Sequence, residues 1–455
     1  MPVEVVAEKH EETPLNLLAR AGFSSDADWK LYNRIASRLL PFLILLYVIS
    51  FVDRINIGFA KLRMAGDIGL SDAAYGFGAG IFFVAYCLCE VPSNLMLARV
   101  GARFWIARIM IVWGVVSAAM MFVHSPLSFY LMRALLGAAE AGFFPGVILY
   151  LTYWFPARQR AQAVSLFLLG IALAGVLGGP LSGWLMQTLD GRWALHSWQW
   201  LFLLEGAPAV LAGIATLRVL DDNPAKAGWL DPDECQRVLG TLAHERAARD
   251  AQGHAHRLGD ALRSGDVWRL SLINFTQIGG IYGLAFWLPQ IIHELGVKGL
   301  INTGFVSAIP FGISAIGMVL VGRHSDRSGE RRWHVAGPAL IGAFGLVLSG
   351  TFATMPTISL LGLTLAAFGL ISANAVLFAL PGTLLSGTAA AAGIGLISTI
   401  GNIGGYVFPF TIGWIRELTG RPSYCLFVLA AVSCVGALVM LRMPSTGRAR
   451  NHVVA

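Results

Sequence analysis

Four charged residues stand in otherwise apolar surroundings, and they are the first candidates for chemistry. Asp53 and Arg54 are adjacent, and Arg133 and Glu140 lie seven residues apart. Seven residues of α-helix rise roughly 10 Å, about two turns, so Arg133 and Glu140 share one helix face at different depths. Charged groups are costly inside a bilayer and usually face a cavity or a partner. We therefore expect these four side chains to meet in a shared cavity.

Two roles for these four residues remain open. In the first, the two arginines and two carboxylates neutralise one another as a static network that closes a helix bundle. In the second, Arg54 or Arg133 binds an anionic substrate while Asp53 and Glu140 carry protons. A guanidinium pairs with a carboxylate through two hydrogen bonds. Burial and a nearby arginine have opposite effects on the proton affinity of a carboxylate, so protonation can depend on substrate and conformation.

Uncharged polar side chains are the candidate substrate contacts in the second half of the chain. Amides and phenols either hydrogen-bond a polar substrate group or bridge two helices. Tyr282 is favoured for binding because it follows Asp53 by 229 residues, an offset that recurs in the chain. Asn402 is favoured because the glycines around it allow close backbone approach. Asn274 and Asn374 complete this set.

The surroundings of these residues indicate an all-α membrane protein. The chain is 56% hydrophobic and 13% charged, and the stretch from Val335 to Ile415 has no charged residue. Since one crossing of the hydrocarbon core needs about 20 apolar residues, this stretch alone accommodates three or four spans. We predict twelve transmembrane helices in two groups of six. The spans are near 37–58, 73–97, 104–123, 127–150, 160–187, 198–218, 267–292, 302–322, 335–354, 356–379, 390–415 and 422–442.

A weak internal repeat supports the division into halves. Gly101-Ala-Arg103 recurs as Gly329-Glu-Arg331 after 228 residues, and Pro180 and Pro409 are 229 apart. Duplicated six-helix halves are the parallel-repeat plan of major facilitator transporters. In the linker, Asp231-Pro-Asp-Glu has the early proline and acidic first turn of a helix start. The predicted parts are an N-terminal tail 1–36, a first half 37–218, a linker 219–266, a second half 267–442 and a C-terminal tail 443–455.

The distribution of positive charge predicts the topology. With the N-terminus inside, the outer loops receive only six of the 33 Lys and Arg residues, namely Lys61, Arg63, Arg192, Lys298, Arg416 and Arg421. By the positive-inside rule, both termini are therefore expected in the cytoplasm. The short loop after the eighth span carries Asp326, Arg327 and Arg331. These charges either brace neighbouring helix ends and separate during transport, or simply anchor the loop.

Nothing in the sequence indicates an enzyme. No nucleophile–base pair is apparent, and the five cysteines (Cys87, Cys89, Cys235, Cys425 and Cys434) have no metal-ligand spacing. We expect no catalytic residue, no metal and no cofactor, with protons as the coupling ion. Net charge +7 is attributed to topology, not to nucleic-acid binding. Glu90 is assigned a structural role, and Glu205 no role in transport.

The motifs around these residues closely resemble the anion:cation symporter family of the major facilitator superfamily. The resemblance covers about 35–442 and both halves. Its motifs are Val52-Asp-Arg-Ile-Asn-Ile-Gly58, Glu90-Val-Pro-Ser-Asn94, Glu140-Ala-Gly-Phe-Phe-Pro-Gly146, Tyr153-Trp-Phe-Pro156, Gly179-Pro180 and Trp287-Leu-Pro-Gln290. It implies the major facilitator fold and proton-driven uptake of an organic anion, such as tartrate, an aromatic acid or a sugar acid, across the bacterial inner membrane.

The resemblance also implies roles for individual residues. Asp53 and Glu140 match the family's proton-coupling carboxylates, and Arg54 and Arg133 match its membrane arginines. Tyr86 and Asn402 match cavity positions.

Two departures from the family pattern stand out. The loop from Leu97 to Arg103 lacks the acidic residue that its second copy keeps as Asp326. Ile171 replaces an amide expected in sugar-acid carriers, which favours a less hydroxylated or an aromatic acid.

The sequence thus predicts a proton-coupled symporter that imports a small organic carboxylate by alternating access. Because one chain contains both halves, a monomer embedded in the bilayer can work alone. The first alternative is an exporter or exchanger of organic acids or drugs on the same fold. A more remote alternative is a membrane sensor derived from a transporter, which would bind ligand without flux.

Overall fold

The computed structural model describes residues 16–20, 23, 25–251, 262–378, 380 and 387–443, and every regular element in this part of the chain is a helix. Residues 1–15, 252–261 and 444–455 of the predicted tails and linker lie outside the described residues. The first half comprises α1 (Asp26–Ile55), α2 (Ile57–Ile68), α3 (Asp72–Val100), α4 (Ala102–Ala119), α5 (Pro126–Glu140), α6 (Phe143–Thr152), α7 (Ala157–Thr188) and α8 (Ser197–Val219). After α9 (Pro232–Ala251), the second half comprises α11 (Gly265–Glu294), α12 (Leu300–Ser328), α13 (Arg332–Thr351), α14 (Pro356–Leu377), α16 (Gly387–Thr419) and α17 (Pro422–Leu441).

These helices form twelve membrane crossings. Eleven helical segments of the described chain are long and apolar enough to span a bilayer, with α1–α2 and α5–α6 each counting as one. The twelfth crossing is α11, which is 30 residues long and packs against α16, α17 and α14. Its polar residues lower its hydropathy. The predicted fold, two groups of six transmembrane helices, is confirmed.

Two predicted spans differ in detail from the observed helices. The first helix starts at Asp26, well before residue 37, and it is interrupted only at Asn56 before α2 continues to Ile68. The span predicted at 127–150 is broken at Ala141 and Gly142. Gly142 has φ +87°, and a side chain there would collide with the Ser93 hydroxyl at 2.2 Å. The positive φ and the close approach of α3 both require glycine at this break.

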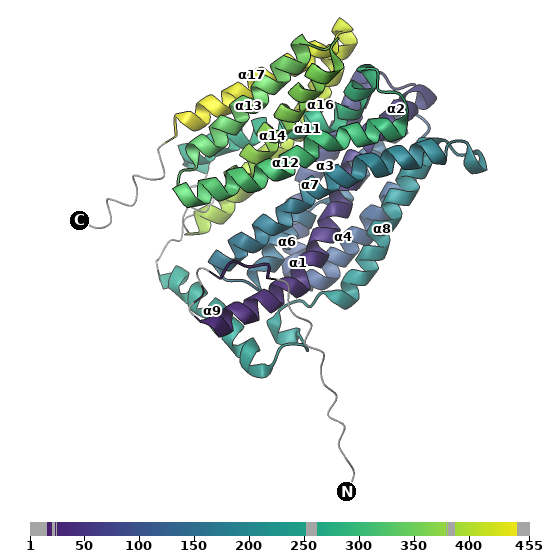
Figure 1. Ribbon diagram of the computed structural model, residues 1–455. Coiled ribbons are helices and arrows are strands. Elements are labelled where there is room, and N and C mark those ends of the chain that lie inside the picture. Colours follow the sequence, from purple (N-terminus) through teal and green to yellow (C-terminus); the bar gives the residue numbers. More distant parts are fainter. Residues whose placement is uncertain are drawn as a thin grey trace.

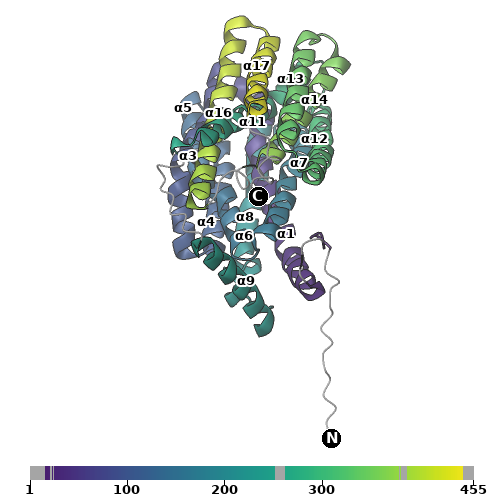
Figure 2. The ribbon, with the colours of Figure 1, turned by 90° about the vertical axis from the view of Figure 1, so that its left-hand side faces the viewer.

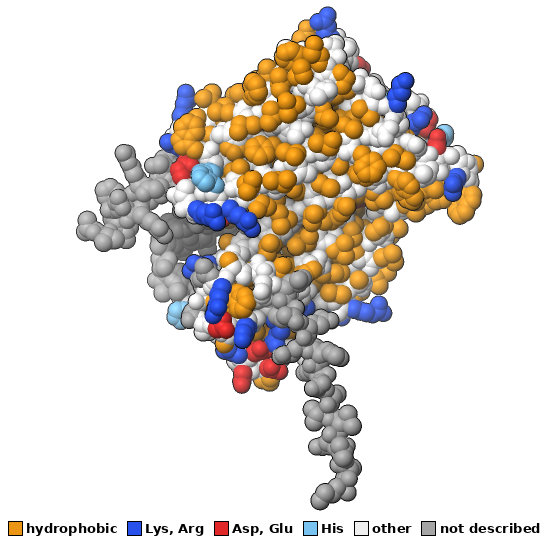
Figure 3. All heavy atoms as spheres, in the orientation of Figure 1, with side chains coloured by type: hydrophobic (Ala, Val, Ile, Leu, Met, Phe, Trp, Pro, Cys, Tyr) orange, Lys and Arg blue, Asp and Glu red, His pale blue; other side chains and the backbone are white. Residues whose placement is uncertain are grey.

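The two halves lie side by side and touch along two seams, α3 with α16 and α7 with α12 (Figures 1 and 2). Glycine permits this contact. A Cβ at Gly304 would stand 2.3 Å from the Gly179 carbonyl oxygen, and one at Gly76 would stand 2.4 Å from that of Pro409. Lipid provides no hydrophobic driving force for helices to associate, so close packing through small residues stabilises the contact instead. Figure 3 shows hydrophobic side chains covering the middle of one face, with charged side chains near its ends, as expected for a membrane protein.

The linker forms a surface helix at one end of the bundle. α9 begins at Pro232, as the Asp231-Pro-Asp-Glu pattern predicts, and Glu234 on it forms an ion pair with Arg34 of α1 (Figure 1). We call this end, which also carries Met443, the α9 end. The other end, with turns at Gly69 and Gly420, is the far end.

Candidate functional site

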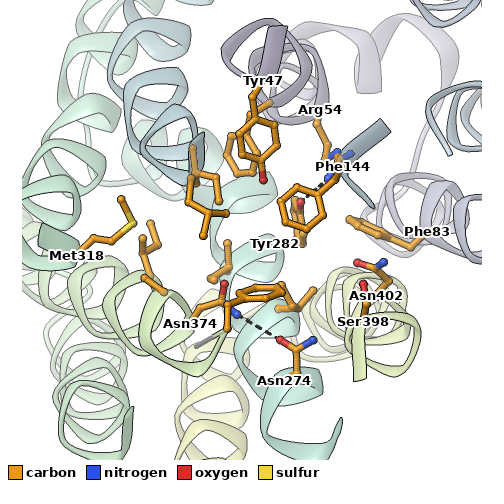
Figure 4. Close-up of a pocket in the computed structure, with 18 of the residues that line it drawn as sticks. Tyr47, Arg54, Phe83, Phe144, Asn274, Tyr282, Met318, Asn374, Ser398 and Asn402 are labelled. Atoms are coloured by element: carbon orange, nitrogen blue, oxygen red, sulfur yellow. Dashed lines mark hydrogen bonds between the residues drawn. The ribbon is translucent and has the colours of Figure 1, made fainter. Parts of the chain in front are cut away.

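A pocket lies between the two halves (Figure 4). It encloses about 840 Å³, a figure that includes space open to solvent. The first half supplies residues from α1, α3, α6 and α7, and the second half supplies residues from α11, α12, α14 and α16. The lining residues are Tyr47, Phe51, Arg54, Phe83, Tyr86, Phe144, Leu168, Ile171, Asn274, Ile278, Ile281, Tyr282, Met318, Ile371, Asn374, Ala375, Phe378, Ser398 and Asn402.

Most of the substrate contacts expected from the sequence line this pocket. They are Arg54, Tyr86, Asn274, Tyr282, Asn374 and Asn402. The seventh, Arg133, does not line it, and neither do the two expected proton carriers, Asp53 and Glu140.

Arg54 connects the pocket to a carboxylate behind its wall. Its guanidinium pairs with Glu140, which also accepts a 2.8 Å hydrogen bond from the Ser50 hydroxyl. Another guanidinium nitrogen donates to the Tyr282 hydroxyl of the opposite half at 2.7 Å. Arg54 is 8% exposed, Glu140 is 1% exposed, and Arg54 Nε has no hydrogen-bond partner among the described residues. An anion in the pocket would compete with Glu140 for one arginine.

Asp53 points away from the pocket into the first half. Its carboxylate accepts hydrogen bonds from Trp113 Nε1 at 2.5 Å and from the Ser117 hydroxyl, both on α4, and from Asn56 at 3.4 Å. The side chain is 1% exposed. Adjacent residues of α1 point in different directions, so Asp53 and Arg54 occupy separate environments.

Arg133 is enclosed entirely by protein. It is 0% exposed and donates to the backbone carbonyls of Gly78 and Ala79 at 3.4 and 3.1 Å, with its guanidinium 5.0 Å from the centre of the Phe82 ring. It forms no ion pair with Glu140 among the described contacts, although both were expected on one helix face. In this conformation Arg133 braces α5 against α3.

The second half contributes a fixed pair of amides. Asn274 Nδ2 donates to the Ile397 carbonyl at 2.9 Å, and Asn374 Nδ2 donates to Asn274 Oδ1 at 3.3 Å. A Cβ on Gly401 would stand 2.1 Å from Asn274 Nδ2, so this amide rests directly on α16. Asn402 is half-buried on the same helix.

The aromatic character of the wall was largely missed by the sequence reasoning. Tyr47 lies with its ring centre 5.7 Å from that of Phe144, and Phe83 lies 4.6 Å from Tyr282. Phe144 and Phe378 meet from opposite halves at 6.1 Å. Aromatic residues are so common in these spans that no local signal marks those that face the pocket.

Charged residues close the far end across the halves. Asp72 of α3 accepts from Lys61 at 2.7 Å and from Arg416 of α16 at 3.0 Å, and Arg416 also pairs with Glu294 at 2.5 Å. We call Lys61, Asp72, Glu294 and Arg416 the far-end cluster. Lys61 and Arg416 were expected in outer loops, but they lie within helices and their side chains are 4% and 9% exposed. The cluster therefore joins the halves instead of only marking topology.

The expected gating loop makes no such connection among the described residues. Asp326 and Arg327 were expected in the loop, but they lie in the last turn of α12. Arg331, which precedes α13, pairs with Asp326 at 2.6 Å, and Arg327 is exposed. In the first half, where the matching acidic residue is missing, Asp222 of the linker accepts a hydrogen bond from the Arg103 backbone at 3.1 Å. The linker thus supplies the carboxylate that the loop lacks.

Two further carboxylates are buried outside the lining. Glu205 of α8 accepts a 2.8 Å hydrogen bond from the Ser182 hydroxyl, and Glu90 of α3 is 6% exposed. Neither forms an ion pair among the described contacts.

Comparison with known proteins identifies the family. Residues 43–409 match the Major Facilitator Superfamily. A putative tartrate transporter of Agrobacterium vitis is 46% identical over 432 residues, which cover 95% of this chain and 99% of the relative. A quinolone resistance transporter of Acinetobacter baumannii is 42% identical over 414 residues, covering 91% and 95%. The structure of the xylose transporter XylE from E. coli, 16% identical, superposes with a TM-score of 0.73 over 90% of this chain and 98% of that one. This chain belongs to the major facilitator superfamily and is a multi-pass membrane transporter, not an enzyme.

Proposed function

We propose that this protein is a proton-coupled symporter that imports a small organic anion across the bacterial inner membrane, with both termini in the cytoplasm. One observation carries the proposal: Arg54 faces the pocket while it is ion-paired with Glu140 behind the wall. The relative named as a putative tartrate transporter supports an organic anion as cargo.

The coupling follows from competition for Arg54. When Glu140 is ionised, it occupies the guanidinium, and a second anion in the pocket is disfavoured. A proton on Glu140 removes that competitor, so the substrate carboxylate pairs with the Arg54 guanidinium. Proton and anion therefore bind together. Asp53 is the second proton carrier in this scheme, and more than one proton per monoanion would make transport electrogenic.

Alternating access is assigned to the two ends of the bundle. With the α9 end in the cytoplasm, the closed far-end cluster corresponds to an inward-facing state. Opening toward the outside requires Arg416 to separate from Asp72. The charges of the loop that contains Asp326, Arg327 and Arg331 then become available to brace the α9 end as it closes.

The proposal is tested by uptake into liposomes with an imposed pH gradient. Glu140→Gln and Asp53→Asn should lose accumulation against a concentration gradient, while Glu140→Gln retains counterflow exchange of the same anion. Glu205→Gln is the matched control, because it alters an equally buried carboxylate that has no arginine partner in the described contacts. Full gradient-driven accumulation by Glu140→Gln or Asp53→Asn would show that the corresponding residue is not a coupling site.

A second candidate function is export of an aromatic compound. It is favoured by the relative named for quinolone resistance and by the aromatic wall of the pocket. Counterflow that is independent of pH, without uphill uptake of any carboxylate, would favour the exporter.

A further inference from the structure

The charges at the pocket limit the substrate to one carboxylate. Among the described lining residues, Arg54 alone is charged. A second carboxylate would therefore lie against apolar groups and neutral amides. Desolvating an ion without a partner costs several kcal/mol, so the pocket selects against a dianion, even though a 46% identical relative is named for tartrate.

The pocket wall is suited to an apolar, flat body. Rings of Tyr47, Phe83 and Phe144 line it together with aliphatic side chains that include Ile171 and Ile371. Aromatic faces and edges bind another ring in offset or edge-to-face arrangements. Substrate hydroxyl groups that lie against these ring faces and aliphatic side chains would lack hydrogen-bond partners, which is unfavourable.

The Asn374 amide lies across the pocket from Arg54, and its orientation is fixed by a chain of hydrogen bonds. The Ile397 carbonyl can only accept, so it must receive the Asn274 NH₂ group. Asn274 Oδ1 is then the acceptor for the NH₂ group of Asn374. This leaves Asn374 Oδ1, and Figure 4 shows that oxygen turned toward the open space of the pocket. Although a side-chain amide alone can be flipped, this one is oriented by a backbone carbonyl.

We infer that the pocket takes an aromatic monocarboxylate that carries a hydroxyl or N–H donor at the end remote from the carboxylate, and that Asn374 is the specificity-determining residue. The inference rests on the proposed function, since it assigns the carboxylate to Arg54. The ring lies between the aromatic walls, and the remote donor bonds to Asn374 Oδ1.

The test is equilibrium binding to the purified full-length protein by calorimetry, with six probes: benzoate, 4-hydroxybenzoate, 4-methoxybenzoate, the 3-hydroxy and 3-methoxy isomers, and L-tartrate. The 3-hydroxy and 3-methoxy isomers cover a second donor position. At least one hydroxyl compound should bind about 5-fold or more tightly than its methoxy partner, because the methyl group leaves the buried acceptor unpaired. L-tartrate should bind more weakly than benzoate.

A variant pair assigns the effect to Asn374. Asn374→Leu should bring the hydroxy-to-methoxy affinity ratio close to one. Asn302→Leu, which removes an amide at the far end that bonds only to the Lys298 carbonyl in the described contacts, should keep the wild-type ratio. The wild-type ligand series tests the inference even if Asn374→Leu does not fold.

The outcomes separate this inference from the proposed function. Tighter binding of L-tartrate than of benzoate overturns the monocarboxylate assignment and leaves proton-coupled anion transport standing. Equal affinity for hydroxy and methoxy partners, or an unchanged ratio in Asn374→Leu, overturns the role of Asn374. If a folded protein binds none of the carboxylates, the proposed function itself fails.

Discussion

Glu140→Gln should abolish the pH dependence of anion binding. Glutamine keeps the shape of the side chain and still accepts the Ser50 hydroxyl hydrogen bond, but it cannot neutralise Arg54. The variant therefore resembles the protonated wild type at every pH. Under the proposed competition, a proton on Glu140 frees Arg54, so affinity of the wild type for the anion should be highest at low pH and should fall as pH rises.

The expected size of the effect follows from the burial of this ion pair. Its side chains are 9% and 1% exposed, and removal of one partner from such a pair costs about 3–5 kcal/mol. That energy is the largest amount by which a proton on Glu140 can favour binding of the anion. At about 1.36 kcal/mol for each tenfold change in affinity, it corresponds to at most roughly two to four powers of ten in anion affinity.

Calorimetric titration of benzoate from pH 6 to pH 9 measures how affinity depends on pH. Because benzoate stays ionised throughout this range, any change in affinity comes from the protein. Affinity of the wild type should fall as pH rises over this range, and the fall should be markedly smaller in Glu140→Gln. Glu205→Gln should keep the wild-type slope. The same slope in Glu140→Gln as in the wild type would refute the competition for Arg54.

Three further predictions concern the pocket and its closure. Arg54→Lys should weaken benzoate binding about tenfold or more in calorimetry, since an ammonium lacks the planar fork that reaches both present partners. Gly401→Ala should displace the Asn274 amide and reduce the hydroxy-to-methoxy affinity ratio, because the added Cβ would lie 2.1 Å from its nitrogen. Arg416→Gln removes the cation that joins Asp72 and Glu294 in the far-end cluster. Backbone hydrogen exchange at the far end of α11 should therefore increase several-fold. The control is Arg421→Gln, which alters an exposed arginine.

Much of the pocket could be predicted from the sequence because polar groups are rare in membrane spans. A lone arginine or amide in an apolar helix usually faces a cavity or a partner, and Arg54, Asn274 and Asn374, which this principle selects, line the pocket. The repeat offset also marked Tyr282, which meets Arg54 across the two halves. The twelve crossings followed from the long uncharged stretches in the same way.

The partners behind the pocket wall could not be predicted. Trp113 and Ser117 are unremarkable in sequence, yet they hold Asp53, while Arg133 is held by backbone carbonyls that are present at every position of a helix. Sequence spacing indicates that a residue is buried but not which neighbour it meets there. Lys61 shows the same limit, because only the tertiary fold brings it to Asp72.

The site divides its chemistry between the two halves. The charged pair Arg54 and Glu140 belongs to the first half, and the oriented amides Asn274 and Asn374 belong to the second, whose residues from Val335 to Ile415 contain no charge. Substitutions in the second half can therefore alter the amide side of the pocket without disturbing the ion pair between Arg54 and Glu140. This separation gives a physical reason why relatives 46% and 42% identical to this chain can be named for such different cargoes.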